Sequence, residues 1–171
     1  MYFDLFGQIK KQLGQLRTWL EIAAKHAEAR KFDPNLFLAF RLAPDQFPFA
    51  RQVGFTCDTA KNAVKYLTGK DVPAHADNEQ SLAELGARIT SVIAILDGVS
   101  EKDLEGAAKR TVSQPRWEGK WMSGHDYFVQ HAVPNFYFHL NHAYALLRHN
   151  GVDVGKKDYL GAIERRDPPA P

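Results

Sequence analysis

Apolar residues recur every three or four positions in four separate segments of this 171-residue chain. This spacing places them on one face of an α-helix, whereas a β-strand would show alternation at every second residue. The four segments span residues 2–30, 45–68, 79–97 and 124–149. Helices with one apolar face each bury those faces against one another, so the pattern predicts an all-α four-helix bundle.

Local start and stop signals set the limits of these segments. Asp45 is a candidate N-cap for the second helix, and Gly69 is a candidate stop. Residues 77–80 combine acidic and amide side chains ahead of the third helix. Pro73 lies in the loop between the second and third helices.

The segment before the last helix is irregular. Residues 111–121 contain a proline and a Glu-Gly turn, which predict a small hairpin. Ser123 and Asp126 form a capping pair at the start of the last helix. Pro134 predicts a kink within that helix, because it cannot donate a hydrogen bond to the preceding turn.

Composition restricts the classes of function. The 22 basic and 20 acidic side chains give a net charge of +2 without a polybasic run, so we expect no nucleic-acid partner. No apolar run approaches the roughly 18 residues needed to span a bilayer, so we expect no membrane partner. The single cysteine, Cys57, cannot close an internal disulfide, which favours a cytoplasmic location. We expect one domain over residues 1–164 and a mobile tail over 165–171.

Four of the seven histidines fall between residues 131 and 149. On a helix, the side chains at positions 135, 139, 142, 146 and 149 share one narrow stripe, which includes Asn135, His139 and His142. Imidazoles on one helix face can bind a metal, relay a proton or complete a buried hydrogen-bond network. We favour the network, because histidines in protein cores are usually hydrogen-bonded rather than metal-bound.

A metal site at this stripe needs a third ligand from another helix. The second helix has no histidine, and Asp58 is its only interior carboxylate. His139, His142 and Asp58 would form a two-histidine, one-carboxylate set that suits zinc or iron. Otherwise Asp58 needs Arg51, Arg148 or a histidine as a partner, because an unpaired buried carboxylate is costly. A structural ion pair is favoured over a general base.

Two other features have structural interpretations. Cys57 lies in the apolar repeat of its helix, which favours an inert core thiol over a histidine-activated nucleophile. The aromatic residues at 117, 121 and 136–138 favour loop packing or a dimer contact over a ligand cage.

Several segments of the chain are typical of a known group: Ala43–Pro48, Arg51–Val53, Asp58–Lys61, Pro134–His139, Ala143–Ala145 and Leu147–Gly151. Over residues 2–161 the chain resembles an uncharacterised bacterial domain-of-unknown-function family within the DinB/YfiT-like helical-bundle superfamily. The resemblance implies a four-helix bundle with up-down-down-up order and a long crossover. Many members of that superfamily bind zinc or nickel through one histidine of the second helix and a histidine pair in the last. Some are metal-dependent thiol transferases.

This chain departs from that pattern, because the second helix has no histidine and His139 and His142 are three residues apart rather than four. We therefore expect a small-ligand-binding or non-catalytic member that lacks the usual three-histidine site and has no metal cofactor. We also expect a homodimer. Its ligand site or polar network is expected to comprise Arg51, Asp58, Asn135, His139, His142 and Arg148. The alternative is a thiol transferase or hydrolase that uses zinc, nickel or iron on His139, His142 and Asp58. A third hypothesis is a module that acts only through protein association.

Overall fold

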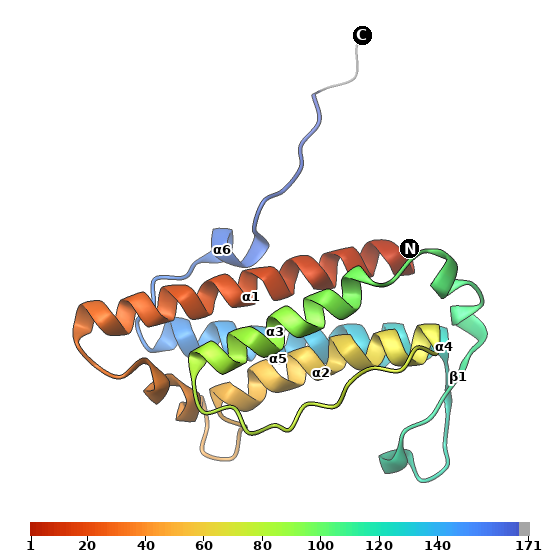
Figure 1. Ribbon diagram of the computed structural model, residues 1–171, viewed down its shortest axis with the longest axis horizontal. Coiled ribbons are helices and arrows are strands. Elements are labelled where there is room, and N and C mark those ends of the chain that lie inside the picture. Colours follow the sequence, from red (N-terminus) through yellow and green to blue (C-terminus); the bar gives the residue numbers. More distant parts are fainter. Residues whose placement is uncertain (168–171) are drawn as a thin grey trace.

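Four long helices pack side by side in the computed structural model, which describes residues 1–167 (Figure 1). They are α1 (Tyr2–Arg30), α2 (Phe49–Thr68), α3 (Leu82–Asp97) and α5 (Val133–His149). A long crossover after α2 returns the chain to the end of the bundle at which α2 began, so α2 and α3 run in the same direction. α1 and α5 run in the opposite direction. The all-α bundle and its up-down-down-up order are as predicted.

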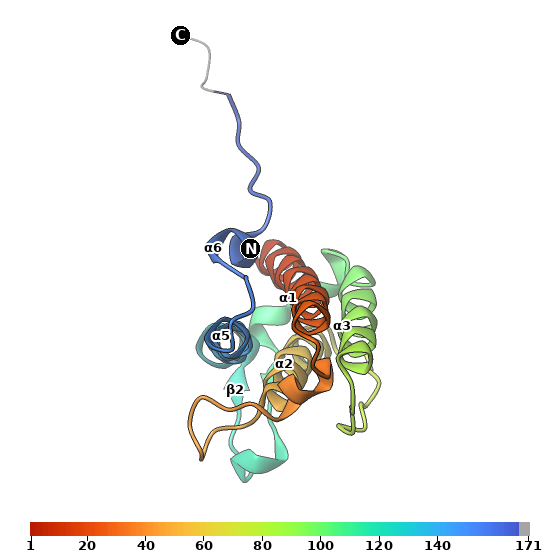
Figure 2. The same cartoon turned by 90° about the vertical axis from the view of Figure 1, so that its left-hand side faces the viewer.

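Helix α2 packs between α3 and α5 and contacts both of them (Figure 2). Helix α1 packs on α3, and the short helix α6 (Lys156–Leu160) packs on α1. Trp19 of α1 is fully buried beneath α6, where its ring stacks on Tyr159 and its indole nitrogen donates to the Asp158 carbonyl over 3.2 Å. Helix α6 was not predicted, because five residues are too few to show a helical period.

Two predicted helix starts are corrected. Helix α2 begins at Phe49 with Pro48 as its N-cap, so Asp45 is not the cap. A proline disfavours the helical conformation in the residue before it, which prevents the helix from extending further toward the N-terminus. Helix α3 begins at Leu82, and the hydroxyl of Ser81 accepts from the Glu84 amide over 3.2 Å.

The last long helix has three stretches. Helix α4 (Gly124–Asp126) continues into a π-helical segment, Tyr127–Ala132, and then into α5. Ser123 caps this helix as predicted, with its hydroxyl accepting from the Asp126 amide over 3.1 Å. In place of a simple kink, the turn before Pro134 is wider, and the Val133 amide donates to the carbonyl of Phe128, five residues back.

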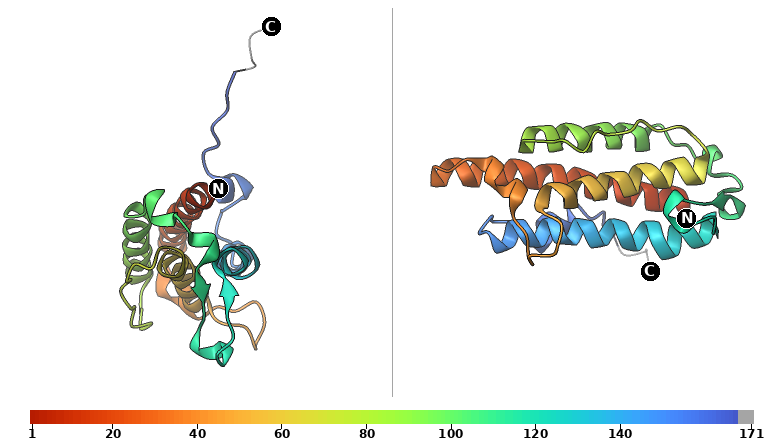
Figure 3. Two further views of the ribbon diagram at one scale, coloured as in Figure 1. Left: turned by 90° about the vertical axis from the view of Figure 1, so that its right-hand side faces the viewer. Right: turned by 90° about the horizontal axis from the view of Figure 1, so that it is seen from below.

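A small antiparallel hairpin precedes α4. Strand β1 (Thr111–Val112) pairs with β2 (Met122–Ser123), and Thr111 lies opposite Ser123. The hairpin projects beside the end of the bundle where α2 ends and α4 begins (Figure 3). Within residues 1–167, no helix is long and apolar enough to cross a membrane. The predicted mobility of the tail concerns residues 165–171, of which 168–171 lie outside the described part.

A candidate ligand-binding hollow between α2 and α5

Helices α2 and α5 and the hairpin enclose a hollow of about 300 Å³. Most of its lining side chains are polar, and they come from three separate elements: Phe55, Asp58, Thr59 and Asn62 from α2, Gln114 and Arg116 from the hairpin, and Tyr127, His131 and Asn135 from the π-helical segment and α5. The hollow therefore contains Asn135 and Asp58, which the sequence predicts as site residues, together with several residues that it did not predict.

The antiparallel pairing of α2 and α5 determines which residues meet. Asn135 donates from its side-chain amide to the hydroxyl of Thr59 over 2.7 Å. That hydroxyl donates to the Phe55 carbonyl one turn back, also over 2.7 Å. At one end of the hollow, the Tyr66 and Tyr127 rings pack edge to face. These contacts fix the position of α5 and the π-helical segment relative to α2 along the hollow.

His131 is fixed at the edge of the hollow by Arg116. The Arg116 guanidinium donates from Nη2 to Nε2 of His131 over 2.6 Å, so the proton of the neutral ring is on Nδ1. That Nδ1 is buried and has no hydrogen-bond partner. The ring also stacks on Tyr127, with 5.5 Å between centroids. Burial, together with the Arg116 charge, lowers the pKa of His131, so the ring is neutral at pH 7.

His139 lies one turn beyond Asn135 and contacts α2, on the side that its stripe predicts. Gln52 donates from Nε2 to the Phe47 carbonyl over 3.0 Å, which leaves its Oε1 to accept from Nδ1 of His139 over 2.8 Å. The His139 ring also packs on Phe55, with 5.0 Å between centroids. Burial lowers the pKa of His139 to about 4, and the proximity of His142 contributes.

His142 has different partners from those of His139. Its Nδ1 donates to the Phe138 carbonyl over 2.7 Å, and its Nε2 accepts from the side-chain amide of Gln46 over 3.3 Å. Arg148 is a correction to the predicted polar network, because it is solvent-exposed and its nearest acidic partner is Asp153, at 3.4 Å. The predicted stripe thus includes two separately bonded histidines and ends at the surface.

Asp58 forms its ion pairs with cations of α3 and α2 and not with His139 or His142 of α5. Its Oδ1 lies 2.8 Å from Nη2 of Arg88 and 3.2 Å from Nζ of Lys61. The predicted ion pair is present, but its main partner, Arg88, was not among the candidates. Arg88 lies between Leu85 and Ile89 of the apolar repeat of α3. This position in the sequence could have identified Arg88 as a buried cation and a candidate partner for Asp58.

Arg88 is the centre of an ion-pair network that also joins the crossover to the bundle. Its side chain is 2% exposed, and its Nη1 lies 2.6 Å from Asp77 and 2.8 Å from Glu79. Arg51 completes the network with a 3.0 Å contact to Asp77, and its guanidinium also lies over the ring of Phe55. Three cations, Arg51, Lys61 and Arg88, thus face three carboxylates, Asp58, Asp77 and Glu79, so the network is neutral overall.

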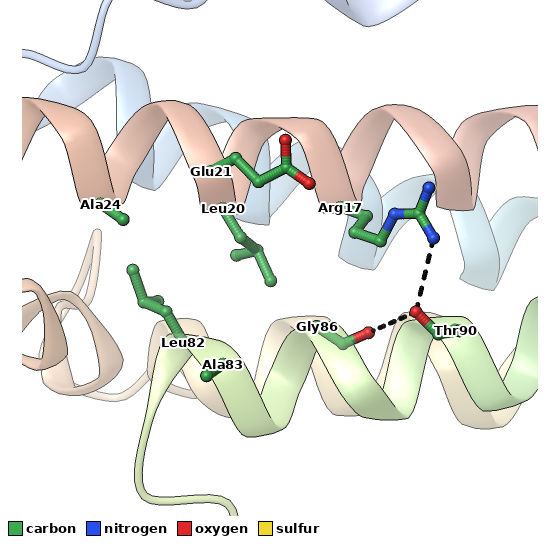
Figure 4. Close-up of a pocket in the computed structure, with 8 residues that line it drawn as sticks. All are labelled: Arg17, Leu20, Glu21, Ala24, Leu82, Ala83, Gly86 and Thr90. Atoms are coloured by element: carbon green, nitrogen blue, oxygen red, sulfur yellow. Dashed lines mark hydrogen bonds between the residues drawn. The ribbon is translucent and has the colours of Figure 1, made fainter.

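A second hollow, of about 310 Å³, lies between α1 and α3 (Figure 4). Leu20 and Ala24 of α1 face Leu82 and Ala83 of α3, and Arg17 lies at one end, where it donates to Thr90. This groove exists because small side chains leave the two helices incompletely packed. Its polar lining residues are Arg17, Glu21 and Thr90, fewer than those of the α2–α5 hollow, which makes it the weaker candidate.

The sequence model of a domain of unknown function, DUF1993, matches residues 1–160. The chain belongs to the DUF1993 family. No functionally curated protein matches it. Among solved structures, this DUF1993 chain is similar to the crystal structure of a DinB family member from Shewanella denitrificans, with 48% sequence identity and a TM-score of 0.94. The similarity covers 98% of this chain and 96% of that one. The predicted family and DinB-like bundle are therefore confirmed.

The metal set considered for this DUF1993 chain is not assembled. Nowhere in residues 1–167 do three or more histidine, cysteine, aspartate or glutamate side chains form a group that could hold a metal ion. Asp58 is paired with Arg88, whereas His139 and His142 are bonded to Gln52 and the Phe138 carbonyl. These residues do not fit a zinc, nickel or iron centre, which needs converging, unprotonated donors.

Cys57 of this DUF1993 chain is fully buried in the core. Burial raises the pKa of its thiol to about 12, because the charged thiolate is poorly solvated there. The negative charge of Asp58 acts in the same direction, although the positive charge of Arg88 opposes it more strongly. Cys57 therefore packs as a small apolar side chain, as the apolar repeat predicts.

Proposed function

We propose that this DUF1993 protein binds a small organic ligand in the hollow between α2 and α5, without a metal and without catalytic turnover. The observation that carries the proposal is the convergence of polar side chains from three separate elements on one hollow of about 300 Å³. Ligand pockets typically combine such a volume with apolar walls and a few placed polar groups. Phe55 and Tyr127 supply the walls, and Thr59, Asn62 and Asn135 supply polar groups.

The π-helical segment supports this location. Wide helical turns of this kind are rare and are frequently found at functional sites. Here the segment Tyr127–Ala132 supplies two lining residues, Tyr127 and His131. Binding therefore gives a reason for the irregular backbone at this position.

The absence of turnover is supported by the state of the titratable groups. A general base works best with a pKa near the working pH, and the pKa of His139 is lowered to about 4. Nε2 of His131 accepts from Arg116, and Asp58 is paired with Arg88. The metal-enzyme alternative has weaker support, because His139, His142 and Asp58 do not converge. The homodimer and the cytoplasmic location stay predictions.

Binding can be tested with a panel of small aromatic fragments, each present in anionic, neutral and cationic form. In ¹H–¹⁵N correlation spectra, we expect the largest shifts at Thr59, Asn62 and Asn135. Asn62→Phe should abolish these shifts by filling the hollow. The matched control, Lys65→Phe, lies on the exposed side of the same helix and should bind as the parent does.

Two results would contradict the proposal. One is a panel in which no fragment of any charge perturbs the hollow residues. The other is a set of shifts centred on Leu82 and Thr90, which would place binding in the α1–α3 groove instead.

A further inference from the structure

Arg116 is a cation without an acidic partner at the mouth of the α2–α5 hollow. Within residues 1–167, it forms no ion pair at 4.0 Å or less, although the exposed side chain of Glu118 lies on the same loop. The other charged residue that lines the hollow, Asp58, belongs to the neutral network around Arg88. Among the charged residues that line the hollow, Arg116 is therefore the one whose charge no ion pair neutralises.

The Arg116 side chain is held in place rather than free to move. Its Nε donates to the side-chain carbonyl of Gln114 over 2.9 Å, and its Nη2 donates to His131 over 2.6 Å. A guanidinium has five N–H donors, so three remain for a ligand. A guanidinium fixed in this way loses little conformational entropy when it binds a planar anion.

The surrounding groups also favour an acceptor. Nδ1–H of His131 is a buried donor without a partner, and leaving such a group unsatisfied is costly. Tyr127 and Asn62, which also line the hollow, carry a hydroxyl and an amide that are further donors. Burial raises the pKa of Tyr127, so its hydroxyl keeps its proton and remains a donor at neutral pH.

We infer that the ligand of this hollow is a small aromatic or apolar monocarboxylate, whose carboxylate binds Arg116 and whose body packs between Phe55 and Tyr127. The inference rests on the proposed binding function and adds the class of ligand. A single guanidinium matches the geometry and the single charge of a carboxylate. A phosphate dianion is less well matched, because one cation would leave half of its charge uncompensated.

The test compares phenylacetate with phenylacetamide, which has the same shape and no charge. In the parent protein, NMR titration should give a dissociation constant at least about fivefold lower for phenylacetate, as expected for a charge-assisted hydrogen bond at a partly exposed site. Arg116→Gln should remove that preference, so that the dissociation constants of phenylacetate and phenylacetamide lie within about twofold of each other. The matched control is Lys120→Gln, which removes an exposed charge on the same hairpin and should keep the preference.

The outcomes separate the two proposals. Equal binding of phenylacetate and phenylacetamide in the hollow, with no effect of Arg116→Gln, overturns the carboxylate class and leaves ligand binding standing. Tighter binding of inorganic phosphate than of phenylacetate at the same residues also overturns the carboxylate class. Binding of neither phenylacetate nor phenylacetamide, with no other fragment of the panel in the hollow, overturns the proposed function itself.

Discussion

Nδ1 of His139 donates to Oε1 of Gln52 over 2.8 Å, and this bond joins α5 to α2. Gln52 is 2% exposed, and its own amide nitrogen is committed to the Phe47 carbonyl. The neutral, Nδ1-protonated form of His139 is therefore held by a fixed acceptor. The same bond removes Nδ1 from metal binding, because the proton occupies the lone-pair position that a metal would use.

The lowered pKa of His139 makes the stability of the fold depend on pH. In the folded state this pKa is about 4, whereas an unfolded histidine titrates near 6.5. Between these values the unfolded chain binds more protons, so the free energy of unfolding should fall as the pH falls from 7 to 4. The pKa values of His75 and His131 are also lowered, which acts in the same direction. Urea unfolding at pH 7.5, 6 and 5 measures the effect.

The contribution of His139 can be separated by NMR titration of its ring. We expect no protonation near pH 6.5 in the parent protein. Gln52→Glu places a carboxylate beside the ring and should raise the pKa of His139, because an opposite charge favours the imidazolium. A parent His139 that titrates near pH 6.5 would contradict the neutral, hydrogen-bonded ring described above.

Removal of Arg88 should destabilise the protein strongly. Arg88→Met leaves Asp58, Asp77 and Glu79 facing one another with fewer cations, and breaking a buried ion pair from one side costs about 3–5 kcal/mol. Asp58→Asn should cost less, because Arg88 keeps two carboxylates. The control is Arg148→Met, whose partner Asp153 is fully exposed and whose loss should cause no measurable change. Midpoints of urea unfolding test this ranking, and equal effects of all three variants would refute it.

The four helices were predictable because an amphipathic helix requires apolar residues at a spacing of three or four positions, which is visible in the local sequence. The limits of α1 at Tyr2 and Arg30 agree with the apolar period. The start of α2 was misplaced because Asp45 is a good cap in isolation, whereas Pro48 sets the start through its backbone restriction. The apolar periodicity therefore predicted the helices, whereas a local steric effect of Pro48 determines where α2 begins.

The site was predicted less completely, because a helix face does not identify its neighbour. Asp58 was correctly expected to need a partner, but only the packing of α3 on α2 brings Arg88 to it. His131 precedes Asn135 by four residues and could have been included in the stripe. Its partner Arg116 lies on the hairpin. The position of the hairpin beside the bundle depends on tertiary contacts, which the local sequence pattern does not predict.

Cys57 should be unreactive in the folded protein. Its thiol is fully buried and the raised pKa of about 12 keeps it protonated. A thiol reagent should therefore label it only when the protein unfolds, since the thiolate is the reactive form. Labelling kinetics at increasing urea should follow the unfolding curve, with the fully unfolded chain as the control for intrinsic reactivity. Rapid labelling in native buffer would revive the nucleophile hypothesis.

His142 separates a structural network from a metal site. Its Nδ1 donates to the Phe138 carbonyl and its Nε2 accepts from Gln46, so both ring nitrogens are occupied. His142→Ala should therefore lower the free energy of unfolding by about 1 kcal/mol through loss of these bonds. Since no metal contributes, the decrease should be the same with and without a chelator, and His139→Ala should show the same independence.

A ligand that binds only the folded state stabilises it by mass action, so a metal site predicts a decrease only when metal is present. Metal analysis of tag-free protein completes the test. Stoichiometric zinc, nickel or iron that disappears in both variants would show that the histidines rearrange to bind metal in solution.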